Sequence, residues 1–355
     1  MSCGESRCHH KVRRRVPTAI VESDPIALRR KRQLQECKLL LNMGPSLRLA
    51  ALALSVCMLA NSSAARESDE MRVTLLGTGT PFPSAEQFGS AILIEVAGKK
   101  FLFDCGRGVV IRLAQNGVDP KEINGLFLTH LHSDHVVGIP DLWLTGWFLG
   151  RNTPLAMWGP PGTRTMAKHL AHAFGFDMRV RQDSPDPLPA KGVAIDAKEI
   201  GQGEIYNDGL VRVSAFLVDH GSVKPAFGYR IDCASHSVVI SGDTKFCQNL
   251  VDFAKNTDCL IHSAWSAGWK NPVRPSQRSI ASGEDAGRAF AIVEPKLAIV
   301  YHYNDEEGLE EAVRENYTGP LVIAKDLMRI NVGNGVTWKQ QPADTQTPTE
   351  KAIKR

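Results

Sequence analysis

The sequence lacks any run of about 18 unbroken apolar residues, the length that a helix needs to span a membrane. It does not lack apolar residues as such, because 43% of its 355 residues are hydrophobic and 23% are charged, as in ordinary globular proteins. These proportions exclude a mainly disordered chain. We therefore expect a folded protein with no stable membrane insertion.

The body of the chain, residues 66–355, is not basic, although the formal net charge of the whole chain is +4. Residues 1–65 carry 11 Lys/Arg against 4 Asp/Glu, which leaves 31 against 34 in residues 66–355. A basic stripe is the usual electrostatic mark of a nucleic-acid-binding protein. The slightly acidic body therefore predicts that nucleic acid is not the partner.

No CxxC spacing occurs, so the cysteines do not indicate a structural zinc site. A body of this length buries enough apolar surface to fold without disulfides. We expect free, mainly buried thiols at the four cysteines that follow residue 65, namely Cys105, Cys233, Cys247 and Cys259.

The N-terminal extension of residues 1–65 has the pattern of a targeting signal. Residues 43–65 combine a cation at Arg48, an apolar stretch over 49–60 and small residues up to Ala65, which is the layout of a secretory signal peptide. This predicts a periplasmic or secreted protein, with the upstream residues explained by a start codon assigned too early. The alternative is a basic N-terminal tail on a cytoplasmic protein.

The body indicates one α/β domain, residues 70–337, followed by a polar tail, residues 338–355. Strand-like runs come early and late, helical patterns lie between them, and no internal repeat or second linker is found. Alternation and turn residues predict strands at 71–76, 91–96, 100–104, 125–129, 211–218, 227–231, 237–241, 297–301 and 321–324. Helical spacing predicts helices at 108–116, 164–174 and 282–292.

Three histidines and an aspartate follow the predicted strand at 125–129, in the segment THLHSDH over residues 129–135. Imidazole nitrogen and carboxylate oxygen are the ligands that Zn²⁺ favours in catalytic sites. In extended backbone His130 and His132 point to the same side, so both can bind one ion. The turn that follows directs Asp134 and His135 toward a second position.

Further ligand-type residues stand at the ends of other predicted strands. His220 ends one, Asp243 follows another in the segment SGDT, and His302 follows the strand at 297–301. Functional residues gather at strand ends and in the loops after them. We therefore expect these three side chains to complete one shared metal site.

The THLHSDH segment, the later His, the SGDT segment and the final His together resemble the metallo-β-lactamase superfamily. TLLGTGTP near residue 75, FDCGRG after residue 102 and HGSVKPAFGYRI around His220 narrow the resemblance to its ribonuclease Z and arylsulfatase-like branch. The resemblance covers about residues 73–332 and implies a four-layer αβ/βα sandwich with two zinc ions. By motif position, it implies a first ion on His130, His132 and His220, a second on Asp134, His135 and His302, and Asp243 bridging them.

The resemblance implies a zinc-dependent hydrolase that uses a metal-bridging hydroxide, oriented by Asp134, on a small phosphodiester, sulfate or carboxylic ester. One alternative is an endoribonuclease that processes the 3′ end of tRNA. Such proteins usually carry a long arm between the His and the SGDT segment, whereas 23 positions separate His220 from Asp243 here. The other alternative is a metal-binding relative without turnover, and a homodimer is possible in each case.

Two positions depart from the pattern of related hydrolases. His262 is followed by Ser263, where the relatives have a Glu, and Ile280 stands where they have a His that assists the leaving group. An isoleucine cannot donate a proton, so the sequence predicts a preference for good leaving groups. We expect Trp265, Trp269, His262 and Ile280 to lie around a substrate pocket, with the two tryptophans as its walls and His262 supporting the site rather than acting in it.

Overall fold

The computed structural model describes residues 69–265 and 279–341. The predicted leader of residues 1–65, Trp269 and all but the first residues of the predicted tail lie outside these ranges. Within them, no helix combines the length and the apolarity that crossing a membrane requires. Residues 69–341 belong to one compact unit of the chain.

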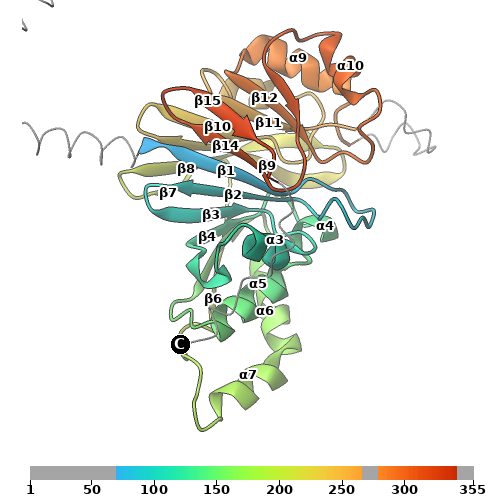
Figure 1. Ribbon diagram of the computed structural model, residues 1–355. Helices are drawn as coiled ribbons and strands as arrows, with labels where there is room; N and C mark the ends of the chain where they lie inside the picture. The colour runs from blue at the N-terminus through green and yellow to red at the C-terminus, as the bar shows by residue number, and fades with distance from the viewer. Residues whose placement is uncertain (1–68, 266–278, 342–355) are drawn as a thin grey trace, which may run out of the picture. The chain divides into compact units, whose positions relative to one another are not determined.

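Two mixed sheets form the centre of this unit (Figure 1). The first sheet has, in spatial order, β15 (Val336–Lys339), β14 (Met328–Val332), β1 (Met71–Gly77), β2 (Ala91–Val96), β3 (Lys99–Phe103), β4 (Gly125–Phe127), β5 (Leu155–Gly159) and β6 (Ile195–Glu199). The second has β13 (Leu321–Ile323), β12 (Leu297–Tyr301), β11 (Cys259–Ser263), β10 (His236–Ile240), β9 (Val223–Cys233), β8 (Val211–His220) and β7 (Gly203–Asn207).

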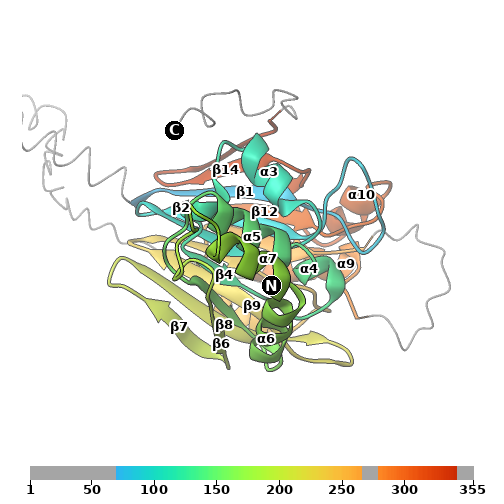
Figure 2. The ribbon, with the colours of Figure 1, turned by 90° about the horizontal axis from the view of Figure 1, so that it is seen from below.

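Helices cover the outer face of each sheet (Figures 1 and 2). Those that follow strands of the first sheet are α3 (Val109–Gln115), η1 (Pro120–Glu122), α4 (Ser133–Val136), α5 (Ile139–Phe148), α6 (Thr163–Ala173) and α7 (Gly175–Gln182). Those that belong to the second are α8 (Gln248–Phe253), α9 (Gly283–Val293) and α10 (Leu309–Arg314).

Three apolar clusters separate the layers. The largest lies between the sheets and includes Val73 of β1, Phe127 of β4 and Ile261 of β11. A second packs α8, α9 and α10 on the outer face of the second sheet, and a third packs α3, α5 and α6 on the outer face of the first. Because residues along a strand point alternately to its two faces, strands such as β4 and β12 contribute to two clusters. The architecture is the four-layer αβ/βα sandwich that the sequence predicts.

The predicted strands and helices are confirmed, with ends that shift by up to four residues, most of all for the strand at 227–231, which is β9. The predicted strand at 125–129 ends at Phe127, which leaves Thr129 and the metal-type residues after it in a loop. The fold also extends two residues beyond the predicted domain end, because β15 reaches Lys339. The four cysteines after residue 65 are free, and three of them are buried.

Glycines bring three loops into close contact behind the metal-type residues. A Cβ atom on Gly106 would lie 2.5 Å from the carbonyl oxygen of Asp134, and one on Gly89 would lie 3.0 Å from it. One on Gly77 would lie 2.0 Å from the carbonyl oxygen of Gly89. Only a residue without a side chain fits at these points. The glycine-rich turn after β1 therefore supports the loop that carries Asp134.

Asp326, after β13, fixes this group of loops from a distance of more than 200 residues along the chain. Its buried carboxylate accepts hydrogen bonds from the backbone N–H and hydroxyl of Thr78 and from the backbone N–H of Phe88, each at 2.8 Å. It also pairs with the buried guanidinium of Arg112 at 2.9 Å. That guanidinium stacks on the Phe88 ring, 4.0 Å from its centroid.

Replacement of Asp326 by Ala should lower the free energy of unfolding by about 3–5 kcal/mol, because it leaves the Arg112 charge buried and unpaired. Urea denaturation measures the change. The matched control is Asp252→Ala, which removes an exposed partner of Lys255 and should leave the free energy of unfolding nearly unchanged. Equal losses in the two variants would show that the Asp326 pair does not stabilise the fold.

Candidate metal centre

The THLHSDH segment leaves the first sheet and is fixed at once to the second. The backbone N–H of Phe227, in β9, donates to the carbonyl oxygen of Thr129 at 2.9 Å. His132 then has extended backbone, with φ −65° and ψ 148°, and caps the short helix α4. Asp134 and His135 lie in that helix. The helical turn that begins directly after His132 is the turn that the sequence predicts before Asp134 and His135.

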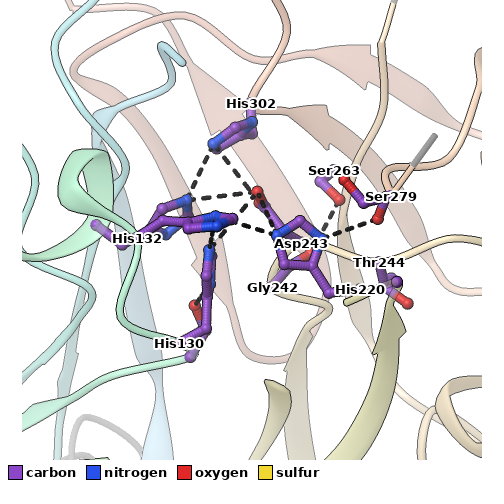
Figure 3. A network of polar contacts seen from close by, with 12 residues as sticks. His130, His132, His220, Gly242, Asp243, Thr244, Ser263, Ser279 and His302 are labelled. Carbon is purple, nitrogen blue, oxygen red and sulfur yellow. Dashed lines mark hydrogen bonds and ion pairs between the residues drawn. The ribbon is translucent and has the colours of Figure 1, made fainter. Parts of the chain in front are cut away.

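Three imidazoles converge in a first group (Figure 3). Nδ1 of His132 lies 2.9 Å from Nε2 of His130 and 3.2 Å from Nε2 of His220. His130 and His220 are buried, whereas His132 is exposed, so this group opens to solvent on the side of His132.

A second group contains Asp134, His135 and His302, all buried. Nε2 of His302 lies 3.1 Å from Nε2 of His135 and 3.2 Å from Oδ2 of Asp134. The structure therefore brings together, in two groups, the residues that the resemblance assigns to two ions.

Asp243 lies between the two groups. Its carboxylate is 4.0 Å from His130 and 3.9 Å from His220 on one side. It is 3.5 Å from His135 and 3.5 Å from His302 on the other. Figure 3 shows its oxygens directed at the histidines. This is the position of a bridging ligand.

The donor set fits divalent ions. Nitrogen lone pairs about 3 Å apart repel one another unless a proton or a cation lies between them. A neutral imidazole carries a single N–H, so three rings whose nitrogens converge have too few protons to pair all of these nitrogens by hydrogen bonds. In a tetrahedral Zn²⁺ site with Zn–N bonds of about 2.0–2.1 Å, neighbouring nitrogens are about 3.3 Å apart. The separations in the first group are close to that value. The residues present can therefore hold metal ions.

The protonation states of the carboxylates suit this role. Burial by itself would raise the pKa of Asp134 and of Asp243, but their contacts with His302 and His135 outweigh it. The pKa of Asp134 is lowered and that of Asp243 is well below its ordinary value. Both side chains are therefore ionised at neutral pH, as metal ligands must be.

The first two histidines of the THLHSDH segment are held neutral. Burial, reinforced by the neighbouring histidines, lowers the pKa of His130 well below its ordinary value. Burial and His220 lower that of His132. Neutral imidazoles keep a lone pair free for an ion.

Asp104 orients two of the candidate ligands, and the sequence alone did not identify it as a site residue. Its Oδ2 lies 2.7 Å from Nδ1 of His135, which leaves Nε2 facing the site. It also accepts the hydroxyl hydrogen of Thr129 at 2.9 Å, and that hydroxyl oxygen lies 3.0 Å from Nδ1 of His130. Such outer partners fix the tautomer and direction of metal-binding histidines. The signal for Asp104 in the sequence was the FDCGRG segment, which contributed above only to the resemblance to the ribonuclease Z and arylsulfatase-like branch.

Backbone strain accompanies this arrangement. Asp104 has φ 59° and His302 has φ 56°, in the left-handed region that side chains other than glycine rarely adopt. Such residues cost of order 1–3 kcal/mol each and persist where the surroundings impose them. On the other side of the centre, Nδ1 of His220 donates to the carbonyl oxygen of Ser279 at 2.9 Å, which directs its Nε2 inward.

The predicted pocket residues lie around the end of β11. The His262 ring is fully buried on the helix side of the strand, against Phe290 of α9, so it cannot line an open pocket. Trp265 is half-buried, and its backbone N–H donates to the carbonyl oxygen of Ala281. Ile280 is half-buried beside Ser279, and Trp269 lies outside the described residues.

A family model described as "Anti-Pycsar protein Apyc1" matches residues 71–311, which include all seven candidate ligands. The chain belongs to this family. A ribonuclease Z of Mycolicibacterium gilvum (strain PYR-GCK) is 32% identical over 284 residues, which are 76% of this chain and 99% of the relative. A ribonuclease Z of Mycobacterium sp. (strain KMS) is 34% identical over 275 residues, 77% of this chain and 90% of the relative.

Solved structures confirm the fold. The metallo-β-lactamase fold protein YhfI of Bacillus subtilis matches with a TM-score of 0.60 at 19% identity, over 74% of this chain and 100% of that one. The short form of human tRNase Z matches with a TM-score of 0.58 at 22% identity, over 73% and 98%. The chain is thus a ribonuclease Z-like metallo-hydrolase of the metallo-β-lactamase superfamily, as predicted. The arylsulfatase-like affinity stays a prediction.

Replacement of Asp104 by Asn should weaken metal binding about 10–100-fold, because His135 loses the carboxylate that orients and polarises it. Competition with a chromogenic chelator, together with elemental analysis of the purified protein, measures this loss. Asp141→Asn is the control, since Asp141 is an exposed carboxylate in α5 that bonds only the hydroxyl of Thr145 among the described side chains. Unaltered metal affinity in Asp104→Asn would refute the positioning role.

Proposed function

We propose that this chain is a zinc-dependent phosphodiesterase of the ribonuclease Z type and that RNA is its substrate. The observation that carries the proposal is the arrangement of two ligand groups around the shared carboxylate of Asp243. Relatives named ribonuclease Z that match over 90–99% of their own length support the choice of RNA. This proposal replaces the expectation, based on net charge, that nucleic acid is not a partner.

The side chains divide the work between them. His130, His132 and His220 would hold one ion, and Asp134, His135 and His302 the other, with Asp243 shared. When bound, such ions supply a nucleophilic hydroxide at neutral pH and stabilise negative charge on the phosphoryl oxygens. The exposed side of His132 is where a substrate phosphate can approach, because the remaining six ligands are buried. The ionised Asp134 can accept a hydrogen bond from the attacking oxygen and orient it.

A second candidate function is hydrolysis of a small phosphodiester, sulfate or carboxylic ester. The specific observation in its favour is the absence of an arm between His220 and Asp243. β8 and β9 pair up to His220↔Val223, and β9 and β10 pair from Cys233↔His236, so each connection is a two-residue turn. A gripping arm has no place in this part of the chain.

The metal centre and the substrate can be tested together. The purified protein should contain close to two zinc ions per chain, and His132→Ala should lose at least one of them because it removes the nitrogen shared by both contacts in the first group. Elemental analysis measures the metal. Cleavage of a tRNA precursor with a 3′ extension, compared with bis(p-nitrophenyl) phosphate, an aryl sulfate, a lactone and a β-lactam, measures the activity.

His236→Ala is the matched control, because His236 lies at the β9–β10 turn beside Asp258. It should keep both ions. A metal-loaded protein that hydrolyses a small ester but leaves the RNA intact would reject the proposed substrate and favour the second candidate. Full metal content in His132→Ala would reject the site itself.

Ile280 predicts how the rate depends on the leaving group. With no proton donor at this position, rates on a series of aryl phosphodiesters should rise steeply as the leaving phenol becomes more acidic. Ile280→His should flatten that dependence, since a general acid contributes typically 10²–10⁴-fold with poor leaving groups. Ile280→Leu is the size control and should keep the steep slope. A flat dependence in the unmodified enzyme would show that another group already supplies the proton.

A further inference from the structure

Helices α6 and α7, residues 163–182, form a hairpin between β5 and β6 whose charge differs from that of the rest of the body. Four of its residues are basic and only Asp177 is acidic. Arg181 is paired with Asp177 at 2.9 Å and stacks on the Phe148 ring. The other three are Arg164, Lys168 and Arg179, and none has an ion-pair partner among the described residues. We refer to residues 163–182 as the basic hairpin.

The two cations of α6 lie on one face. Arg164 and Lys168 are spaced by four residues, with His172 four residues further on, so they follow one another along the helix surface. All three are exposed, while Thr163 and Ala167 are buried and anchor the helix. Lys and Arg stripes of this kind are the electrostatic footprint of a phosphate-backbone contact.

The basic hairpin begins beside the metal centre. Gly162, the residue that precedes α6, has φ 102°, and a Cβ atom on it would lie 3.1 Å from Cδ1 of Leu131. Leu131 stands between the ligands His130 and His132. An 11-residue helix is about 16 Å long, so α6 spans the reach of several nucleotides from this starting point.

The backbone N–H groups at the N-terminus of α6 are already bonded and do not offer an anion site. Glu199 occupies this N-terminus, because its Oε1 accepts hydrogen bonds from the backbone N–H groups of Gly162 at 2.8 Å and of Arg164 at 3.2 Å. A polyanion would therefore meet the side chains along the helix. Phe176 of α7, 74% exposed, adds an aromatic surface on which a base can stack.

At the opposite end of the body, α9 and α10 carry more acidic than basic side chains, although two of their carboxylates pair with arginines of the same helices. Glu284 and Asp285 lie in the first turn of α9, and Glu310 and Glu311 lie in the first turn of α10. Figure 1 shows these two helices at the other end of the described body from α6 and α7. A field of this kind repels a polyanion from one end and attracts it to the other.

We propose that the basic hairpin is the RNA-docking surface of this chain, and that it takes the place of the arm that the chain lacks between His220 and Asp243. The inference rests on the proposed function, because it assumes that RNA reaches the metal centre. The single strand or stem next to the cleaved bond lies along Arg164 and Lys168, and its scissile phosphate enters from the side of His132.

The test compares the unmodified enzyme with Arg164→Gln/Lys168→Gln on two substrates. Fluorescence anisotropy with a labelled, 3′-extended tRNA precursor measures Kd as a function of salt, and turnover of bis(p-nitrophenyl) phosphate measures the centre itself. The double variant should weaken RNA binding about 10-fold and lower the slope of log K against log salt by about 1–2, because two phosphate contacts are lost. The loss on RNA should exceed the loss on the small diester at least five-fold.

Lys255→Gln/Lys339→Gln is the matched control, since it removes the same charge from exposed positions outside the basic hairpin. An equal loss of RNA binding in this control, or no loss in the hairpin variant, would overturn the inference. A change of molecular mass in the hairpin variant, measured by light scattering, would also overturn it by assigning the face to contacts between copies of the chain. An unmodified enzyme that is metal-loaded and active on the small diester but does not bind RNA would instead reject the proposed function, and this inference with it.

Discussion

The carboxylate of Asp243 is buried at the boundary between the two sheets, within 4.0 Å of ring nitrogens from four histidines. His130 and His135 come from the segment after the first sheet, and His220 and His302 end or follow strands of the second. Burial by itself would raise the pKa of this carboxylate, but the neighbouring His302 and His135 hold it well below its ordinary value. A shift of one sheet against the other would remove that compensation, so the fold and the site impose the same register on the two sheets.

Several uncharged contacts make that register possible. The hydroxyl of Tyr229, in β9, donates to the carbonyl oxygen of Leu128, and the neighbouring N–H of Phe227 donates to that of Thr129. These bonds fix the backbone directly before His130 to the second sheet. Asp104 then sets the ring directions from the first sheet. The ligand geometry thus depends on both sheets and not on the loop alone.

The seven candidate ligands could be predicted because each is marked locally, either by the THLHSDH spacing or by its place at a strand end. The roles of Asp104 and Asp326 could not be predicted from the sequence, because their partners are distant along the chain. The partners of Asp104 lie 25–31 residues away, and those of Asp326 lie 214–248 residues away. Helix α7 was missed for another reason. None of its residues is buried, so its sequence carries little of the apolar periodicity that reveals a helix.

The positions where the resemblance places an acid carry no usable proton. Burial lowers the pKa of His262 to about 4, and its Nδ1 is already bonded to the carbonyl oxygen of Ser263. The Ser263 hydroxyl donates to Gly242, and Ile280 is apolar. A ribose oxygen is a poor leaving group unless it is protonated or bound to a cation. Two separate parts of the chain therefore limit its reaction. In the function that we propose, the basic hairpin affects which phosphodiester reaches the centre, and the chemistry around Ile280 affects how readily its bond is cut.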